Sequence, residues 1–310
     1  MDEQKMDKMS TAAIILTMNQ REMTLQCLSS LLALQAVPFQ VIVWDNASQD
    51  GTAEAIRAAY PEVLVHHHPT NLGVAGGRNE AARLAIETFQ PAYLLFLDND
   101  MLFEPGFIEA LRRPFAADQT LGQTQAKLRF MHDRERLNDG GGANINFLLW
   151  QITPVGYNEI DQGQYDTPTP CIACGGAMMV RTELFQALGG FDMTFNPFGP
   201  EDLDFSLRLQ KAGYRALYVP EAVAYHVVSH TFGKGYSEDY ARHKSRHWFT
   251  FMRRHASLAQ QLGFFLFGAP YMAGRVVLRE GKKGNLGALR GLFQGGVDYF
   301  KTLLVARRQG

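Results

Sequence analysis

Two aspartates separated by one residue follow an uninterrupted apolar run in this chain. Residues 93–97 are all apolar or aromatic, and Asp98, Asn99 and Asp100 come directly after them. Such a run indicates a strand that is covered on both faces, and open α/β sheets bind ligands at the carboxyl ends of their strands. Two carboxylates at that edge suit Mg²⁺ or Mn²⁺, which commonly shares its coordination with phosphates. The alternative is an Asx-rich turn without an ion.

A second acidic group lies at the start of a predicted helix. Glu201, Asp202 and Asp204 stand between the aromatic residues Phe198 and Phe205. Acidic residues in a first turn stabilise the helix dipole, and that role alone would explain them. A carboxylate in apolar surroundings also has a raised pKa and becomes a candidate general base. The residues by themselves leave both explanations open.

A glycine-rich segment precedes a helix predicted over residues 80–88. Gly73, Gly76 and Gly77 would let the backbone approach a ligand closely, and Arg78 could offer a forked contact to a phosphate. The alternative is a flexible turn. The glycines do not have the GxGxxG spacing and follow the third predicted strand, which argues against a dinucleotide fingerprint.

Two further segments could contribute to a site. Residues 171–180 are small and apolar and predict a strand, in which Gly175 and Gly176 would let a ligand press closely. His226 follows the apolar residues 222–225 and is either a polar residue at the rim of the sheet or a third metal ligand beside Asp100.

The surrounding elements predict an α/β fold. Apolar strands alternate with amphipathic helices at βαβ spacing, with strands over 12–17, 41–44, 63–66 and 93–97 and helices over 22–34 and 53–59. This order predicts a mostly parallel central sheet with helices on both faces. The three histidines at 66–68 would point to alternating faces and cannot converge on one ion, so they indicate a solvated strand end.

The region between residues 115 and 170 is less regular. It predicts strands over 123–130 and 146–152, and a polar, proline-containing loop over 157–170. Long irregular inserts in compact enzymes are often functional loops or lids.

Composition limits the classes of protein. The 310 residues suffice for one large domain or two smaller ones, and a net charge of −1 gives no global argument for nucleic-acid binding. Three cysteines, including the isolated Cys171 and Cys174 pair, form neither a disulfide framework nor a zinc set, so a reducing, cytoplasmic setting is expected. Residues 1–10 are charged and lack the apolar core of a signal peptide.

The C-terminal part differs in character. Residues 236–255 are rich in basic and aromatic side chains, and the apolar stretch at 262–273 is too short to span a bilayer. Basic flanks beside apolar faces predict amphipathic helices that contact an anionic membrane surface. A helical subdomain packed on the enzyme is the open alternative.

Taken together and in order, these motifs resemble the inverting family 2 glycosyltransferases of GT-A fold, in particular their rhamnosyltransferase-like branch. The resemblance covers roughly residues 11–255. The residues that carry it are Thr17-Met18-Asn19, Trp44-Asp45-Asn46-Ala47-Ser48, the segment 71–79, Asp98-Asn99-Asp100, Gly190-Phe191-Asp192 and Pro200-Glu201-Asp202-Leu203-Asp204.

The resemblance implies a role for each matching position. Asp45 would read the base of a nucleotide-diphosphate sugar, Asp202 with its neighbour Glu201 would supply the general base, and Asp100 would be the most direct ligand of Mn²⁺ or Mg²⁺. Other metal positions are Asp98 and His226. Other donor-binding positions are Thr17, Asn19, Asn46, Asn71, Gly73, Arg78, Asp98 and Asn99. Acceptor-side positions are Gly175, Gly176 and Phe198.

The expected protein is a hexosyltransferase-type enzyme with a GT-A domain over residues 11–235 and a helical extension over 236–310, after a leader over 1–10. Within the domain, residues 11–104 would bind the nucleotide sugar and 105–235 the acceptor. The donor would be UDP- or dTDP-linked, with dTDP-rhamnose a candidate. The acceptor would be a glycan or lipid-linked hydroxyl in cell-surface polysaccharide synthesis, and the enzyme cytoplasmic or peripheral at the inner face of the membrane.

Two other functions compete with this one. A non-catalytic nucleotide-sugar-binding module would share the fold but would not need Asp202 as a base. A nucleotidyltransferase should carry a glycine-rich loop after its first strand, where this chain has Met18 to Arg21 without glycine.

Overall fold

A computed structural model describes residues 10–34, 37–173, 175–228 and 237–309 of the chain, with side chains up to residue 302. It divides into two compact units. The sheet unit comprises Met1–Asn144, Pro154–Asn196 and Glu201–Val228. The helical unit comprises Ile145–Thr153, Pro197–Pro200 and Ser229–Gly310. The sequence placed the boundary at 235/236 and did not anticipate the two short segments that belong with the C-terminal helices.

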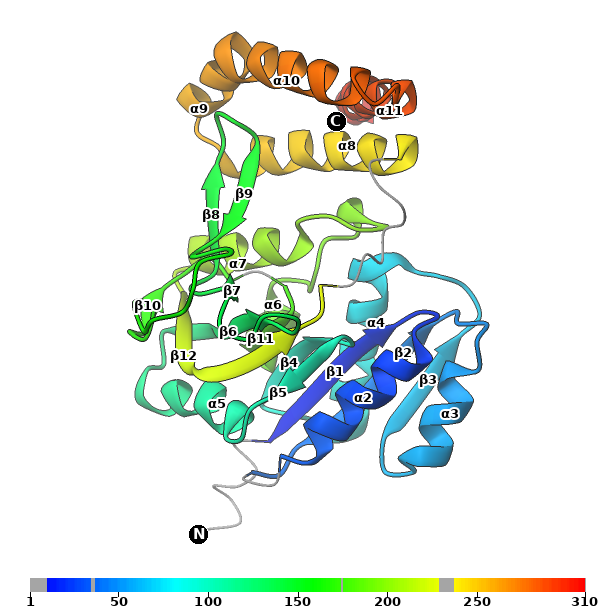
Figure 1. The fold of residues 1–310 in the computed structure, drawn as a ribbon, viewed down its shortest axis with the longest axis vertical. Coiled ribbons are helices and arrows are strands. Elements are labelled where there is room, and N and C mark those ends of the chain that lie inside the picture. Colours follow the sequence, from blue (N-terminus) through cyan, green and yellow to red (C-terminus); the bar gives the residue numbers. More distant parts are fainter. Residues whose placement is uncertain (1–9, 35–36, 174, 229–236, 310) are drawn as a thin grey trace. The chain divides into compact units, whose positions relative to one another are not determined.

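The first half of the sheet unit has the predicted parallel βαβ arrangement (Figure 1). Its strands lie in the order β4-β1-β2-β3, and every neighbouring pair is parallel. These elements are β1 (Thr11–Thr17), α2 (Arg21–Leu32), β2 (Gln40–Asn46), α3 (Thr52–Ala59), β3 (Leu64–His68), α4 (Gly73–Phe89) and β4 (Tyr93–Asp98). Helix α4 begins at Gly73, so the glycine-rich segment forms the first turns of the helix, which the sequence predicted to start at residue 80.

The second half continues the same sheet in the order β10-β12-β6-β11-β4. Strand β11 is antiparallel to both of its neighbours, whereas β12 is parallel to β6, which makes the sheet mixed but mostly parallel. Its elements are β5 (Met101–Phe103), α5 (Phe107–Ala117), β6 (Leu121–Phe130), β7 (Leu137–Asp139), β10 (Thr169–Pro170), β11 (Ala177–Arg181), α6 (Thr182–Ala187), a 3₁₀ turn (Met193–Phe195), α7 (Glu201–Lys211) and β12 (Arg215–His226).

Strand β12 brings His226 to the functional edge of the sheet. Although Pro220 lies within it, β12 is one continuous strand. The pairing of β12 with β6 shifts register between Val219 and Val223, and this irregularity accommodates the proline, which cannot donate to the ladder. Beyond the bulge, β12 also pairs with β5, placing His226 opposite Met101.

The predicted bounds of two other strands were wrong. Residues 171–176 precede strand β11, which begins only at Ala177. The stretch 146–152 is not one strand. It belongs to a hairpin of β8 (Ala143–Asn146) and β9 (Gln151–Pro154), and the apolar residues 147–150 form the tip of this hairpin. Apolarity here reflects packing within the helical unit: Phe147 stacks on Phe251 at 6.0 Å, and Trp150 on Trp248 at 6.1 Å.

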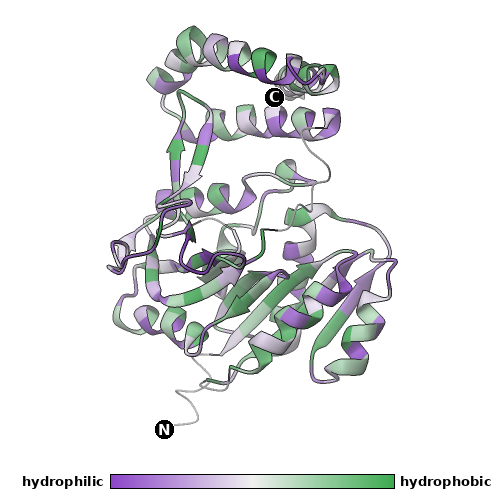
Figure 2. Ribbon diagram, viewed as in Figure 1, coloured by the Kyte–Doolittle hydropathy of each residue, from purple (hydrophilic) through white to green (hydrophobic). Residues whose placement is uncertain are grey.

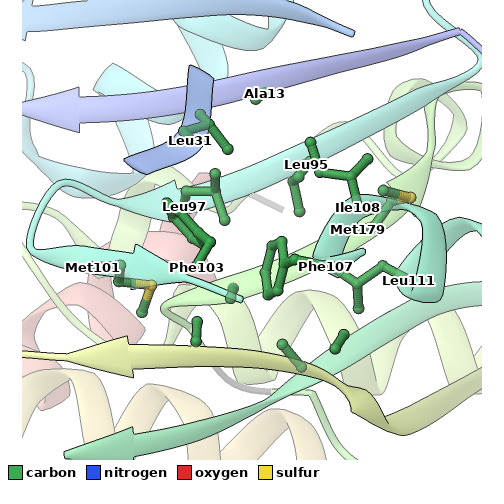
Figure 3. Close-up of a cluster of buried hydrophobic side chains, with 14 of the residues drawn as sticks. Ala13, Leu31, Leu95, Leu97, Met101, Phe103, Phe107, Ile108, Leu111 and Met179 are labelled. Carbon is green, nitrogen blue, oxygen red and sulfur yellow. The ribbon is translucent and has the colours of Figure 1, made fainter. Parts of the chain in front are cut away.

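Strand β4 has apolar side chains buried on both faces, as predicted. Leu95 and Leu97 belong to the cluster that includes Phe107 and Met179 (Figure 3). Leu94 and Phe96 face the opposite cluster, formed with residues from α4, α6 and α7. The two aspartates that follow this strand therefore rest on a backbone fixed from both sides.

The helical unit contains α8 (Glu238–His255), α9 (Leu258–Gly263), a π-helical turn (Phe264–Gly268), α10 (Ala269–Gly281) and α11 (Leu286–Gln309). Helix α11 packs very closely on α8: a Cβ atom added to Gly291 would lie 2.0 Å from the carbonyl oxygen of Glu238, and one added to Gly295 would lie 2.1 Å from that of Arg242. Only glycine fits at both positions.

The expected length of the apolar segment was wrong. Helices α9 and α10 join through the π-helical turn into one helix over Leu258–Gly281, 24 residues long, in which an 18-residue stretch has a mean hydropathy of 1.2 (Figure 2). By length and composition this helix could cross a membrane, a property that core helices of soluble proteins can share. The sequence suggested a stretch of about twelve residues, 262–273, that ended at Arg275 and was too short to span a bilayer.

Candidate active site

Asp98, Asp100 and His226 form a cluster with the geometry of a metal site. The imidazole Nε2 of His226 lies 3.1 Å from Asp100 Oδ1 and 3.7 Å from Asp98 Oδ2. One ligand atom from each residue lies within 4.8 Å of the others. Two carboxylate oxygens and one imidazole nitrogen are a ligand set that suits Mn²⁺ and accepts Mg²⁺.

A hydrogen bond on the side away from the carboxylates fixes the orientation of the His226 ring. Its Nδ1 atom is hydrogen-bonded to Asn138 Oδ1 at 2.9 Å, which leaves Nε2 facing the carboxylates. Burial alone would lower the pKa of His226, but the hydrogen bond to Asp100 and the charges of Asp100 and Asp98 raise it. The sequence did not single out Asn138, which lies on β7 in the irregular region.

Arg78 connects the metal-type cluster to the second acidic group. Its guanidinium is buried, with Nη2 2.6 Å from Asp98 Oδ1 and Nη1 3.3 Å from Glu201 Oε1. It points toward these carboxylates from the second turn of α4. The sequence suggested that this fork binds a phosphate; in the structure both arms contact acidic side chains, and the phosphate contact stays a prediction.

Asp202 is held in place by backbone donors. Its carboxylate accepts hydrogen bonds from the N–H groups of Gly175 and Leu203. A Cβ atom at residue 175 would lie 2.6 Å from Asp202 Oδ2, so a larger residue there would displace this carboxylate. Gly176 has φ +104° and accepts a hydrogen bond from the Asp98 N–H at 2.9 Å. The predicted close approach at these glycines is therefore to the acidic residues, and their acceptor contacts stay a prediction.

Burial gives the acidic pair unusual protonation behaviour. It raises the pKa of Glu201 to about 8, with the charge of Asp202 adding to the effect and Arg78 opposing it. The pKa of Asp202 is also raised by burial, while Arg78 and the two backbone donors lower it. Because Asp202 receives hydrogen bonds that favour its charged form, it is the member of the pair better suited to act as a base.

Asp204 has a different role from its neighbours. Its buried carboxylate pairs with Arg208 one turn later in α7, at 2.7 Å. The guanidinium of Arg208 also donates to the carbonyl oxygens of Leu188 and Gly190. The three acids of this helix start therefore divide into a structural residue, Asp204, and a pair at the site.

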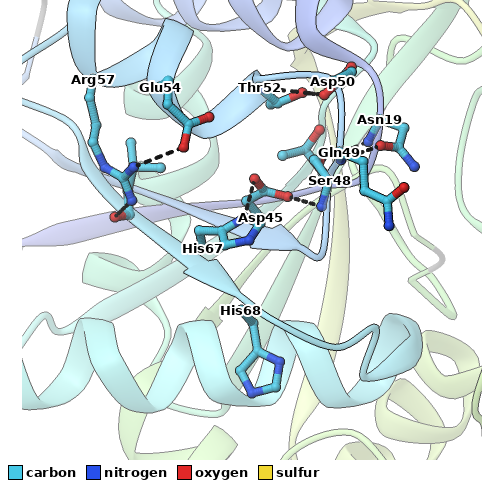
Figure 4. Close-up of polar contacts among 12 residues, drawn as sticks. Asn19, Asp45, Ser48, Gln49, Asp50, Thr52, Glu54, Arg57, His67 and His68 are labelled. Atoms are coloured by element: carbon cyan, nitrogen blue, oxygen red, sulfur yellow. Dashed lines mark hydrogen bonds and ion pairs between the residues drawn. The ribbon is translucent and has the colours of Figure 1, made fainter.

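Asp45 is fully buried at the end of β2 and accepts two hydrogen bonds (Figure 4). Its donors are the Ser48 N–H at 2.9 Å and the Nδ1 atom of His67 at 2.9 Å. The sequence missed His67, although pairing of β2 with β3 places it directly opposite Asp45. His66 points to the other face and stacks on Trp44 at 4.3 Å, which agrees with the expected alternation.

Asparagines shape the neighbouring loops. Asn46 donates to Asn71 Oδ1 at 2.8 Å and to the Gly73 carbonyl oxygen at 3.2 Å, fixing the start of α4. Asn19 has φ +53° and accepts a hydrogen bond from the Gln49 N–H at 2.7 Å (Figure 4). These side chains set the backbone at the strand ends where donor binding is expected.

Thr17 and Asn99 lie in a buried polar network. The Asn99 amide nitrogen contacts Thr17 Oγ1 at 3.1 Å, Thr24 Oγ1 at 2.9 Å and Gln20 Oε1 at 2.7 Å. Their side chains therefore tie the end of β4 to α2, and direct contact with a donor stays a prediction. Thr24 and Gln20 were not predicted to take part.

Phe198, an expected acceptor-side residue, and the loop 157–170, an expected functional loop or lid, have different surroundings. Phe198 belongs to the helical unit and stacks on Tyr240 at 5.2 Å. The loop 157–170 is anchored through Asp161, which pairs with the buried Lys127 at 3.0 Å and with Arg129 at 2.6 Å. These ion pairs hold the segment that the sequence indicated as a functional loop or lid.

The comparisons with known proteins identify the family of this chain. The family model for glycosyl transferase family 2 matches residues 12–189. A second model, described as the N-terminal domain of galactosyltransferase, matches residues 157–231, which include the acidic pair and His226.

Two curated relatives are rhamnosyltransferases. The N-acetylglucosaminyl-diphospho-decaprenol L-rhamnosyltransferase of Mycobacterium tuberculosis is 26% identical over 246 residues, covering 74% of this chain and 80% of the relative. Rhamnosyltransferase WbbL of Escherichia coli is 26% identical over 187 residues, covering 55% of this chain and 67% of the relative.

Solved structures show the same fold. GalNAc-T7 with UDP, GalNAc and Mn²⁺ superposes with a TM-score of 0.62 at 17% identity, covering 79% of this chain but only 48% of its own. Mannosyltransferase PcManGT from Pyrobaculum calidifontis, with GDP-Man and Mn²⁺, has a TM-score of 0.56 at 18% identity, covering 94% and 86%. The chain therefore belongs to glycosyl transferase family 2 and is a rhamnosyltransferase-like glycosyltransferase of GT-A fold.

Proposed function

We propose that this enzyme transfers a sugar, with inversion, from a UDP- or dTDP-linked donor to a hydroxyl of a glycan or lipid-linked acceptor in cell-surface polysaccharide synthesis. dTDP-rhamnose is the leading donor candidate, because two relatives are named as rhamnosyltransferases. The name of the mycobacterial relative specifies a decaprenol-diphosphate acceptor, which supports a lipid-linked acceptor.

One observation carries this proposal: the metal-type cluster and the half-buried carboxylate of Asp202, the candidate base, share the same edge of the sheet unit, and Arg78 lies between them. The guanidinium contacts Asp98 in the cluster and Glu201 beside Asp202. Leaving-group stabilisation and deprotonation of the acceptor are the two tasks of glycosyl transfer, and each has a group here.

The side chains divide the work as follows. Asp45, held by Ser48 and His67, would read the nucleotide base. Asp98, Asp100 and His226 would hold a divalent cation, whose chemistry when bound is to neutralise charge on the departing diphosphate.

Asp202 takes the proton from the acceptor hydroxyl as its oxygen attacks the anomeric carbon from the side opposite the nucleotide. The new glycosidic bond forms while the bond to the diphosphate breaks. A single displacement of this kind inverts the anomeric configuration.

The donor is tested with a panel of UDP-, dTDP- and GDP-linked sugars that includes dTDP-rhamnose. Thermal shift is measured with Mn²⁺, with Mg²⁺ and with EDTA. We expect a metal-dependent rise in melting temperature with one nucleotide class, because ligands that bind only the native state stabilise it. Folded protein that no nucleotide sugar stabilises would contradict the proposal.

The base is tested with Asp202→Asn. We expect transfer to fall by about 10²–10⁴-fold, the usual contribution of general acid–base catalysis, with the donor-induced thermal shift retained. Glu201→Gln is the matched control, because a residue with a pKa of about 8 is already mostly protonated at neutral pH and its replacement should cost much less. Near-normal transfer by folded Asp202→Asn would exclude it as the base.

A cytoplasmic location is part of the proposal. Cys27 and Cys171 are free and buried, and burial raises the pKa of the Cys27 thiol to about 12, so these thiols suit a reducing compartment. Fractionation of cells expressing the full chain tests it: recovery in the cytoplasm or on the inner membrane face is expected, and recovery outside the cytoplasmic membrane would contradict it.

A further inference from the structure

The long helix of the helical unit exposes apolar side chains around most of its circumference. Leu266 is 67% and Phe267 is 69% exposed. Within residues 258–281, the buried positions are Phe264, Gly268 and Glu280. The other exposed large apolar side chains of this helix are Leu258, Leu262, Phe265, Tyr271, Val277 and Leu278. A helix that is apolar on nearly all sides is normally buried in protein or lipid.

The same part of the chain carries a concentrated positive charge. Residues 237–310 contain 13 Lys and Arg against four Asp and Glu, a net charge of +9 in a chain whose total is −1. Exposed basic side chains lie within and just after the apolar helix at Arg275, Lys282, Lys283 and Arg290. Arg275 lies over the exposed ring of Tyr271, 5.7 Å from its centroid.

The connectivity of the helical unit opposes a membrane-spanning arrangement. The start of α11 packs on the start of α8, with Gly291 beside Glu238, and Phe249 further along α8 stacks on Tyr299 at 5.5 Å. The chain therefore leaves the end of α8, runs through helix 258–281 and returns to the start of α8. On the way, Phe265 stacks on Phe249 at 6.2 Å.

Both ends of helix 258–281 are thus held by the α8–α11 pair (Figure 1). Crossing a hydrocarbon core about 30 Å thick would carry the start of α11 to the opposite side from α8. That would separate two helices whose backbones are in direct contact at Gly291 and Gly295.

We infer that the helical unit binds the surface of an anionic phospholipid bilayer, with helix 258–281 lying flat in the headgroup region. Its exposed aromatic and aliphatic side chains enter the boundary of the acyl chains, and the adjacent basic residues contact the anionic headgroups. This surface would hold the enzyme where a lipid-linked acceptor resides. The inference itself does not depend on the proposed donor or acceptor.

The test uses the purified full chain and vesicles, without any sugar. Co-sedimentation is measured with phosphatidylcholine vesicles and with equimolar phosphatidylcholine–phosphatidylglycerol vesicles, at low and high salt. We expect binding to the anionic vesicles that weakens as salt rises, and much weaker binding to neutral ones.

Two double variants separate the contributions. Leu266→Glu with Phe267→Glu should reduce vesicle partitioning by about tenfold or more, since two apolar side chains no longer enter the membrane. Lys282→Glu with Lys283→Glu should reduce it by at least about tenfold, because each basic residue contributes about fivefold. Ile160→Glu is the control: Ile160 is 45% exposed in the sheet unit and its replacement should leave binding unchanged.

Several outcomes would overturn the inference. Folded protein that ignores anionic vesicles would do so, as would equal binding to neutral vesicles. A stable dimer in light scattering, lost in Leu266→Glu with Phe267→Glu and accompanied by no vesicle binding, would assign the surface to a second copy. Membranes from expressing cells that retain the protein after alkaline carbonate extraction would indicate a spanning helix.

Donor-induced thermal shift distinguishes a failure here from a failure of the proposed function. If the chain binds a nucleotide sugar but no vesicle, the proposed transferase function stands and the inferred membrane binding is contradicted.

Discussion

The sheet unit and the helical unit handle charge and apolar surface in opposite ways. In the sheet unit, charged side chains are buried and paired, as with Arg78 between Asp98 and Glu201 or Lys127 beside Asp161. In the helical unit, apolar side chains such as Phe267 and Phe293 are largely exposed. The difference is consistent with the two proposals: a charged, water-borne ligand at the sheet unit and a membrane surface at the helical unit.

This contrast has a consequence for substitutions. Removing a buried charge in the sheet unit leaves its partner uncompensated in a low-dielectric interior, which is costly. Replacing an exposed apolar residue in the helical unit removes no packing and should cost almost nothing. The following predictions test the contrast from its largest expected effect to its smallest.

Arg78→Met should destabilise the protein by about 3–5 kcal/mol, because it leaves the buried Glu201 and the half-buried Asp98 without their cation. Chemical denaturation measures the effect. Arg83→Met on the same helix is the matched control: its side chain is 56% exposed and pairs with Glu80 and Glu87, so a loss of about 0.2–1 kcal/mol is expected. Similar losses for both variants would contradict the role assigned to Arg78.

Asp100→Ala should reduce transfer by about 10²–10³-fold, the usual loss when one preorganised electrostatic contact at a reacting group is removed. It should also abolish the metal-dependent part of the donor-induced thermal shift. Asn138→Ala, which only releases His226, should weaken metal dependence by about 10–100-fold. Unchanged metal titrations for both variants would remove this cluster from the site.

Glu201 should make stability depend on pH. Its pKa rises from 4.5 to about 8 in the folded protein. Between these values the native state holds a proton that the unfolded chain has released, so stability falls as pH rises through this window. Melting curves from pH 4.5 to 8 should show a steeper decline for the wild type than for Glu201→Gln, and parallel curves would contradict it.

The rate of sugar transfer should rise with pH, whereas stability should fall. Because the pKa of Asp202 is raised by burial and only its charged form accepts a proton, kcat/KM should increase with pH until that group is ionised. The pH–rate profile of the wild type checks this, and a rate that falls with rising pH across the same range would argue against a carboxylate base.

Leu266→Gln with Phe267→Gln should change the free energy of unfolding by no more than about 0.5 kcal/mol. Thermal and chemical unfolding both test this. A loss of several kcal/mol would mean that these side chains are packed against protein, and it would weaken the contrast between the two units.

Much of the site was predictable because its residues follow strands. The apolar run before Asp98 fixed a buried strand, and the alternation of strands and helices fixed the parallel order up to β4. The sequence thereby identified Asp98, Asp100 and His226, which the structure brings together.

The supporting contacts were not predictable in the same way. His67 reaches Asp45 through strand register, and Asn138 reaches His226 from an irregular segment. The partners of Arg78 come from positions 20 and 123 residues away in sequence. Motifs reveal residues that perform chemistry, whereas pairing across the fold decides which side chains orient them.

Predictions from apolar residues were wrong where those residues pack in the helical unit and not in the sheet. Residues 147–150 suggested a strand but form the tip of a hairpin in the helical unit. The sequence limited the apolar stretch to residues 262–273, but the helix runs from Leu258 to Gly281 through a π-helical turn.

The close approach of α8 and α11 should constrain which residues can change as the sequence diverges. Gly291 and Gly295 meet the backbone oxygens of Glu238 and Arg242, so no larger residue fits at either position. In distant descendants of this chain, most of the helix surface can drift while both glycines persist four residues apart. Losing either one would mark a lineage in which the two helices have moved apart.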